Sequence, residues 1–111
     1  MEKQIQGHPD YVITDTGDVI SYKGRDVRML IPFYSGRYPK VTIDNEKRYI
    51  ADLVAEAFLP RPENSNCKVF YIDGDPGNCC VDNLAWLSSS DIQLYSQYTL
   101  EYRKQLLRGR G

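Results

Sequence analysis

Cysteine and histidine, the residue types that most often hold metals or act as nucleophiles, are scarce in this chain. Its cysteines are Cys67, Cys79 and Cys80, and His8 is its single histidine. A structural zinc site needs four converging ligands, usually at a C-x-x-C or Cys/His spacing that the sequence lacks. An odd number of cysteines, two of them adjacent, also does not suit a disulfide framework. We therefore expect reduced, partly buried thiols that behave as small hydrophobic groups.

Charge is unevenly distributed along the chain, although the formal net charge is only -1. Residues 23–48 and the last ten residues are basic overall, whereas residues 1–22 and 49–101 are acidic. A nucleic-acid backbone would be attracted to the basic segments and repelled by the central acidic one. Aromatic residues are interleaved with the basic ones in residues 22–49, and such rings can stack on bases.

The first half of the sequence has the pattern of β-hairpins. Residues 11–21 contain two β-rich stretches around a turn at Gly17. A second hairpin is expected from Tyr38–Ile43 and residues 48–50, which flank a turn at Asp44, Asn45 and Glu46. The element order therefore begins with strands.

The second half changes period. Residues 51–58 place apolar side chains at helical spacing, and Pro60 ends this short amphipathic helix. Residues 69–72 predict a brief strand that is followed by turn residues. N-cap candidates at residues 88–91 predict a helix that continues to Leu107 and ends at Gly109.

The size and composition are those of one globular domain, or of two small modules that share a core. The chain has 111 residues, 41% of them hydrophobic and 26% charged. No apolar run approaches the roughly 18 residues that a membrane span needs, and the first residues do not form an apolar signal segment. We expect a soluble protein of the cytoplasm with no membrane partner.

Three segments, taken together, resemble the HNH homing-type endonucleases. They are Leu-Val-Ala-Glu-Ala-Phe-Leu-Pro-Arg-Pro-Glu-Asn at 53–64, Ile-Asp-Gly-Asp at 72–75 and Val-Asp-Asn-Leu-Ala-Trp at 81–86, with Asn78 between the last two. Residues 5–22 further resemble the small module that often precedes the nuclease in phage-encoded members. The resemblance covers roughly residues 4–90.

The resemblance implies an α+β fold in three parts. These are N-terminal β-hairpins in residues 1–50, a ββα-metal finger in residues 51–90, and a C-terminal helix in residues 91–111. It also implies a phage-encoded protein that works in the host cytoplasm. In the family, one divalent cation sits between a strand and a helix of the finger, where it acts with a general base in phosphodiester hydrolysis.

The resemblance also assigns the catalytic positions, and the residues found there do not suit the chemistry. It puts a metal ligand at Phe70, the general base at Tyr71, a second metal ligand in the following helix at Asn83, and a structural asparagine at Asn78; a further family histidine falls at Ala51. Phenylalanine offers no lone pair to a cation, and tyrosine, with an ordinary pKa near 10, is a poor base at neutral pH. We expect a degenerate site with no catalytic residue, no metal and no cofactor, and residual endonuclease activity as the minor alternative. The two asparagines can equally hold turns through backbone hydrogen bonds.

The first functional hypothesis is an inactive DNA-binding module. The basic residues of the hairpins and of the C-terminal helix would contact phosphates, while the competing interpretation is an ordinary solvated face. The predicted nucleic-acid-binding residues are Lys23, Arg25, Arg28, Arg37, Lys40, Lys47, Arg48, Arg103, Lys104 and Arg108.

The second hypothesis is a protein-binding inhibitor of a host protein that itself binds nucleic acid, such as a polymerase or a defence nuclease. An acidic remodelled finger could enter the basic groove of such a partner, with exposed aromatic anchors. The residues involved would be Phe70, Tyr71, Asp73, Asp75 and Asp82. The sequence leaves open whether the two aromatic residues are exposed or fill the emptied site as core, and it leaves the oligomeric state open.

Overall fold

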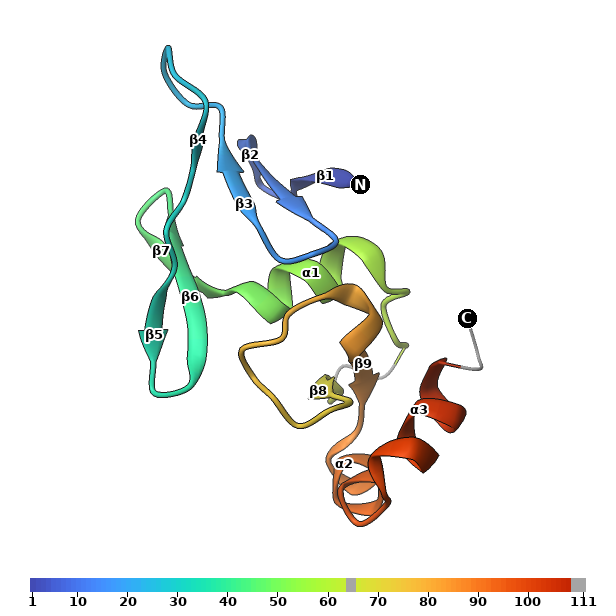
Figure 1. Ribbon diagram of the computed structural model, residues 1–111. Helices are drawn as coiled ribbons and strands as arrows, with labels where there is room; N and C mark the ends of the chain where they lie inside the picture. The colour runs from blue at the N-terminus through green and yellow to red at the C-terminus, as the bar shows by residue number, and fades with distance from the viewer. Residues whose placement is uncertain (64–65, 109–111) are drawn as a thin grey trace.

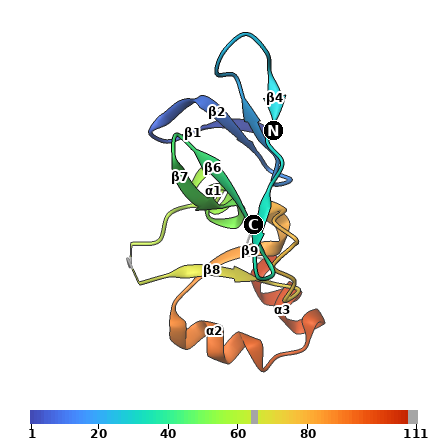
Figure 2. The same ribbon diagram turned by 90° about the vertical axis from the view of Figure 1, so that its left-hand side faces the viewer.

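The computed structural model describes residues 1–63 and 66–108, with the side chain of Arg108 excepted. The molecule is elongated, with principal extents of 47 × 28 × 23 Å. Its elements form three tiers along the long axis (Figures 1 and 2). A four-stranded sheet lies at one end, a three-stranded sheet and the first helix lie in the middle, and a two-stranded hairpin with two helices lies at the other end.

The first tier is an antiparallel sheet of β1 (Glu2–Ile5), β2 (His8–Thr14), β3 (Val19–Ser21) and β4 (Arg28–Met29), in that order. The predicted hairpin at residues 11–21 is confirmed, because β2 and β3 pair in this stretch. Its turn requires glycine at position 17, where φ is 92°, in the left-handed region that other residues rarely adopt.

The second tier contains β5 (Phe33–Ser35), β6 (Tyr38–Ile43) and β7 (Glu46–Tyr49), all antiparallel. The second predicted hairpin is confirmed. Its turn is only Asp44 and Asn45, both with positive φ, as in a two-residue hairpin turn. Because this turn is so short, Glu46 is already the first residue of the returning strand, two residues earlier than the pattern predicted.

Helix α1 (Ile50–Phe58) belongs to the middle tier and contributes to the main core. The helix predicted at residues 51–58 is confirmed, and its apolar face is buried. The main core also includes Ile13 and Val19 of the first sheet, Val41 and Ile43 of the second, and Leu84 from the third tier. Residues 1–50 and 51–90 therefore share one hydrophobic core.

The third tier consists of β8 (Lys68–Tyr71), a 3-10 turn η1 (Val81–Asn83), β9 (Leu84–Leu87), α2 (Ser89–Ser96) and α3 (Leu100–Arg108). The prediction of one continuous C-terminal helix is wrong, and its proposed end at Gly109 lies outside the described residues. The side chain of Ser88 caps α2, and the hydroxyl of Thr99 accepts from the amide of Tyr102, which starts a second helix.

A smaller core holds the third tier together. Phe70, Ile72 and Leu87 are buried there, and Ile92 and Tyr95 of α2 and Leu107 of α3 pack against them. Within residues 1–63 and 66–108, no helix is both long enough and apolar enough to cross a lipid bilayer.

Candidate functional site

The loop between β8 and η1 is organised by the side chain of Asn83, which is only 1% exposed. Its Oδ1 accepts from the amide of Asp73 at 2.9 Å. Its Nδ2 donates to Oδ1 of Asp73 at 2.8 Å and to the carbonyl of Asn78 at 3.0 Å. Both ends of the carboxamide are therefore used to hold the loop, which is the turn-holding role that the sequence had left open for asparagine.

Asp73 also holds this loop together, through hydrogen bonds that its carboxylate accepts. Its carboxylate accepts from the amide of Asp75 at 2.8 Å and from Nδ2 of Asn78 at 2.9 Å, in addition to the bond from Asn83. Partial burial raises the pKa of Asp73, but hydrogen bonds from Asn78, from the amide of Asp75 and from Asn83 outweigh it, so that the pKa is below its ordinary value. Asp73 therefore remains ionised at neutral pH as an acceptor within the loop.

The predicted position of Asn83 in the helix after the hairpin is wrong. Asn83 ends η1, directly before β9, and the helix that follows the hairpin is α2. The sequence spacing from Ile72 to Trp86 identifies Asn83 as a residue of the motif. It carries no information about where the next helix, α2, begins. The helix that does face β8 presents Ile92 and Tyr95 to the small core.

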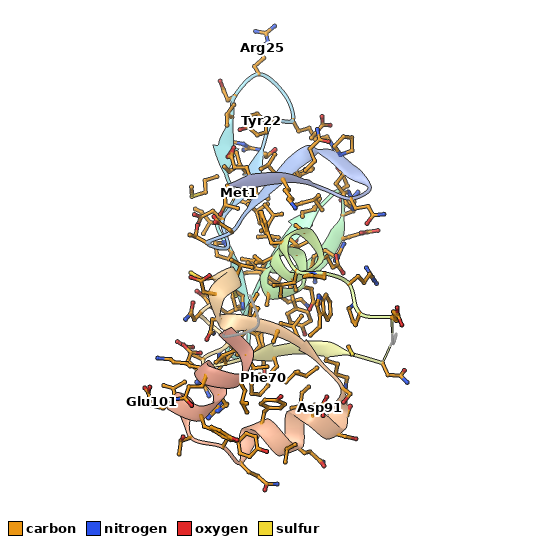
Figure 3. All side chains as sticks on the ribbon, turned by 90° about the vertical axis from the view of Figure 1, so that its right-hand side faces the viewer. Met1, Tyr22, Arg25, Phe70, Asp91 and Glu101 are labelled. Atoms are coloured by element: carbon orange, nitrogen blue, oxygen red, sulfur yellow. The ribbon has the colours of Figure 1, made fainter. Side chains whose placement is uncertain are left out.

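Phe70, at the family's metal-ligand position, points into the space between β8 and α2 (Figure 3). The side chain is 7% exposed. Its ring centroid lies 6.4 Å from that of Tyr95, and the guanidinium of Arg103 lies 5.9 Å from the ring. Phe70 is thus a core residue, and its use as an exposed anchor for a protein partner, one of the predicted options, is wrong.

Tyr71, at the family's general-base position, points to the other side of β8, as alternation along a strand requires. It is partly buried, and its ring centroid is 6.0 Å from that of Tyr38. Burial raises the pKa of Tyr71 well above its ordinary value, and the nearby Cys79 and Asp52 raise it further. A phenol in this state holds its proton at neutral pH and cannot draw one from water.

A groove of about 660 Å³ opens beside Tyr71, between the second and third tiers. In Figure 2, β6 and β7 lie above β8. Asp52 of α1 lines the groove and forms no hydrogen bond with any described residue; burial, followed by the charge of Glu56, raises the pKa of Asp52. Glu56 also lines the groove and is paired with Arg48 at 2.8 Å. Asp52 is not among the residues predicted from the sequence, because its place in the groove depends on strands far away in the chain.

The predicted nucleic-acid-binding residues fall into two groups. Four are exposed and make no ion pair with a described residue: Arg25, Arg28, Arg37 and Lys47. They lie on the β3–β4 loop, on β4, on the β5–β6 turn and on β7; Figure 3 shows Arg25 at the far tip of its loop. Exposed aromatic and apolar side chains lie on the same stretch of the chain, from the β3–β4 loop to the start of β6, namely Tyr22, Met29, Ile31, Phe33, Tyr34 and Tyr38. We call the exposed residues of the β3–β4 loop and of β4 to β7 the hairpin surface.

Four of the remaining predicted residues, Lys23, Arg48, Lys40 and Arg103, have partners inside the protein. Lys23 pairs with Asp44 at 2.9 Å, and Arg48 pairs with Glu56. The ammonium of Lys40 lies 4.4 Å from the ring centroid of Tyr49. Arg103 donates to the carbonyl of Ile72 at 2.9 Å and thereby fastens α3 to β8. Lys104 is partly buried on α3, and the side chain of Arg108 lies outside the described residues.

The cysteines and the histidine lie at separate places in the fold. Cys79 is buried, and burial raises the pKa of its thiol to about 11, while Cys67 and Cys80 are partly buried and none is disulfide-bonded. His8 lies 2.8 Å from a carboxylate oxygen of Asp44, in the first tier. In the part of the chain that the structure describes, no three side chains of histidine, cysteine, aspartate or glutamate converge as a metal site would require.

Comparison of the sequence with protein families and with curated proteins gave no match. Among solved structures, the chain is similar to the HNH homing endonuclease I-HmuI, from a structure that concerns DNA binding and cleavage by that enzyme. The TM-score is 0.69 at 20% sequence identity, over 97% of this chain and 66% of the other. The chain thus spans about two thirds of the length of that protein. At this identity the likeness establishes the fold, which is an α+β, HNH-endonuclease-like fold.

Proposed function

We propose that the chain is a DNA-binding protein that uses an HNH-endonuclease-like fold without cleaving the strand. The observation that carries the proposal is a contrast between two parts of the molecule, the third tier around Phe70 and the hairpin surface. The family's cation position is filled by Phe70 against Tyr95 of α2, while the exposed basic side chains of the hairpin surface are left without ion-pair partners in the described chain.

The absence of cleavage follows from the groups at the site. A divalent cation needs oxygen or nitrogen ligands, and the ring of Phe70 supplies none. Asn83 uses its oxygen to accept from the amide of Asp73 and its nitrogen to donate to Asp73 and Asn78, so its carboxamide is engaged in the loop. Tyr71 keeps its proton. Each of these losses removes a different part of metal-assisted hydrolysis.

DNA binding is supported by the chemistry of the hairpin surface. Cationic side chains attract phosphates, and the interleaved aromatic rings can contact sugars and bases. The similar solved structure concerns an enzyme that binds DNA, which fits this use of the fold. The alternative of a protein-binding inhibitor has less support, because Phe70 is core and Asp73 is engaged within its loop; for Tyr71, Asp75 and Asp82 it stays a hypothesis.

The test is binding of a labelled DNA duplex, measured by fluorescence anisotropy over a series of salt concentrations. We expect log affinity to fall linearly with log salt, with a slope near -0.9 for each phosphate contact. Replacing Arg25, Arg28 and Arg37 together by glutamine should make the slope less negative, by at most the contribution of about three phosphate contacts. Lys104→Gln, on α3, is the matched control and should change it less. No binding at low salt, or an unchanged slope in the triple variant, would contradict the proposal.

Cleavage is tested separately by incubation of supercoiled plasmid with magnesium or manganese. We expect the plasmid to remain intact. Metal-dependent nicking that co-purifies with the protein and is lost in Asn83→Ala would overturn the proposed loss of activity.

A further inference from the structure

The groove between the second and third tiers has the surfaces of a ligand site. Tyr38 of β6, Tyr49 of β7 and Tyr71 of β8 line it, and the ring centroid of Tyr38 lies 6.1 Å from that of Tyr49 and 6.0 Å from that of Tyr71. A volume of about 660 Å³ falls within the range of small-molecule sites. Aromatic faces of this kind stack on flat, delocalised rings.

Asp52 gives this groove a carboxylate that no described residue engages by a hydrogen bond. Its carboxylate is partly buried in the groove and has no hydrogen-bond partner among the described residues. A carboxylate only accepts hydrogen bonds, and its two oxygens are spaced to take two parallel donors. A ligand that fits should therefore offer a flat ring whose edge carries two adjacent N–H donors.

The charges at the groove distinguish between the ligands that have such an edge. Guanine has it, in its ring N1–H and its exocyclic amino group, and so does the guanidinium of an arginine side chain. Arg61 and Lys68 also line the groove and form no ion pair with a described residue, and Lys40 lies over Tyr49. These cations repel a cationic ligand and attract a phosphate, which favours the guanine nucleotide. Adenine and cytosine each place an acceptor beside their amino group, where it would face the carboxylate.

We propose that the groove binds one unpaired guanine nucleotide of a nucleic-acid strand, with its base against the tyrosine rings and its Watson–Crick edge on Asp52. Recognition of an unstacked base by aromatic faces and by hydrogen bonds to that edge is a general mode of single-strand binding. The inference rests on the proposed function, because β6 and β7 supply both the hairpin surface and one wall of the groove. A strand held on the hairpin surface can therefore place one extruded nucleotide in the groove.

The test uses three labelled oligothymidylates that carry guanine, inosine or adenine at their centre. Inosine lacks only the exocyclic amino group, so that it removes one of the two donors. We expect the wild-type protein to bind the guanine strand about 10- to 100-fold more tightly than the inosine strand, as expected for one hydrogen bond to a charged group. Asp52→Asn should abolish this difference, because it replaces one of the two acceptor oxygens by an amide nitrogen, so that only one donor of the base can be accepted. Equal affinity for all three strands in the wild-type protein would overturn the proposal.

Controls separate this inference from the proposed function and from a misfolded variant. Asp52→Asn should leave the far-ultraviolet circular dichroism spectrum and the salt slope for duplex binding unchanged. Duplex binding without a guanine preference contradicts the groove assignment alone, whereas a guanine preference without duplex binding contradicts the proposed function alone. Tyr38→Leu should weaken all three strands together, because it removes a stacking face and no edge contact.

Competition identifies the source of the ligand. Guanosine monophosphate should displace the labelled strand more strongly than adenosine monophosphate, but at a higher concentration than the guanine oligonucleotide needs. A mononucleotide as effective as the oligonucleotide would contradict the assignment to a nucleic-acid strand. Displacement by an arginine-rich peptide and not by the mononucleotide would contradict guanine recognition and indicate a protein ligand.

Discussion

Asn83 is joined to Asp73 in both directions, because its Oδ1 accepts from the backbone amide of Asp73 while its Nδ2 donates to the carboxylate of the same residue. This pair closes the loop of twelve residues, 72–83, that joins β8 to β9. Asn83 therefore has a structural role in this loop that does not depend on any catalytic chemistry.

Replacing Asn83 by alanine should destabilise the protein by about 2–4 kcal/mol, because several buried polar groups lose their partner at once. Urea unfolding followed by circular dichroism measures this. Asn78→Ala, which removes the more exposed donor to Asp73 at 2.9 Å, is the matched control and should cost less. Equal stability of Asn83→Ala and the wild-type protein would show that the loop does not depend on this side chain.

Acid should weaken the same loop. The folded pKa of Asp73 lies below its ordinary value, so the ionised form stabilises the folded state. This contribution is complete above the unfolded pKa of about 4 and is lost as the pH falls through the lower folded value. Urea midpoints between pH 7 and pH 3 should fall less steeply in Asp73→Asn than in the wild-type protein, and parallel curves would contradict this.

Phe70 should behave as a core residue and not as a remnant of a catalytic site. Phe70→Ala should cost about 3–5 kcal/mol of unfolding free energy, whereas Phe70→Leu should cost much less. Phe70→Asp, which restores a potential metal ligand, should be the least stable of the three, because it places a charge among Ile92, Tyr95 and Leu107. Chemical denaturation ranks them. Stabilisation of the aspartate variant by magnesium would show that the site still accepts a cation.

Arg103 should act on stability and not on DNA. It donates to the carbonyl of Ile72 at 2.9 Å and to that of Tyr98 at 3.2 Å, so its guanidinium is committed to the third tier. Arg103→Gln should lower the melting temperature by several degrees, with little change in the salt dependence of duplex binding. A loss of DNA affinity without a loss of stability would contradict this and would support the predicted role of Arg103 as a phosphate contact.

Gly17 should be intolerant of any side chain. A Cβ at this position would lie 3.2 Å from Cβ of Cys79, and the φ of 92° is itself strained for other residues. Gly17→Ala should therefore destabilise the protein by about 1–3 kcal/mol. Gly36→Ala is a matched control, since Gly36 also has a positive φ but open space around it. Similar losses of unfolding free energy at the two positions would mean that the close contact with Cys79 adds nothing to the cost of the substitution.

Local chemistry explains which parts of the fold could be predicted. Gly17 and the Asp44–Asn45 pair mark hairpin turns by their own conformational preferences, and α1 carries its apolar stripe within nine residues. The break between α2 and α3 was missed because the cap at Thr99 is one hydroxyl inside a stretch that otherwise reads as helix.

The site was less predictable, because its meaning depends on contacts between distant segments. The loss of ligand chemistry at Phe70 and Tyr71 was visible in the residue types. The direction in which each side chain points was not, since it depends on α2 on one side of β8 and on Tyr38 on the other. Asp52 gave no signal at all, because an acidic residue in the first turn of a helix is ordinarily explained by the helix dipole.

Trp86 pairs with Val69 across the β8–β9 hairpin and also lines the groove, and it is the only tryptophan in the chain. The fluorescence of its indole ring therefore reports on the groove alone. A molecule that enters beside the tyrosines should quench or shift that emission, while one that stays on the β3–β4 loop should not. Titrations without any attached dye can thus separate occupancy of the two surfaces in the unmodified protein.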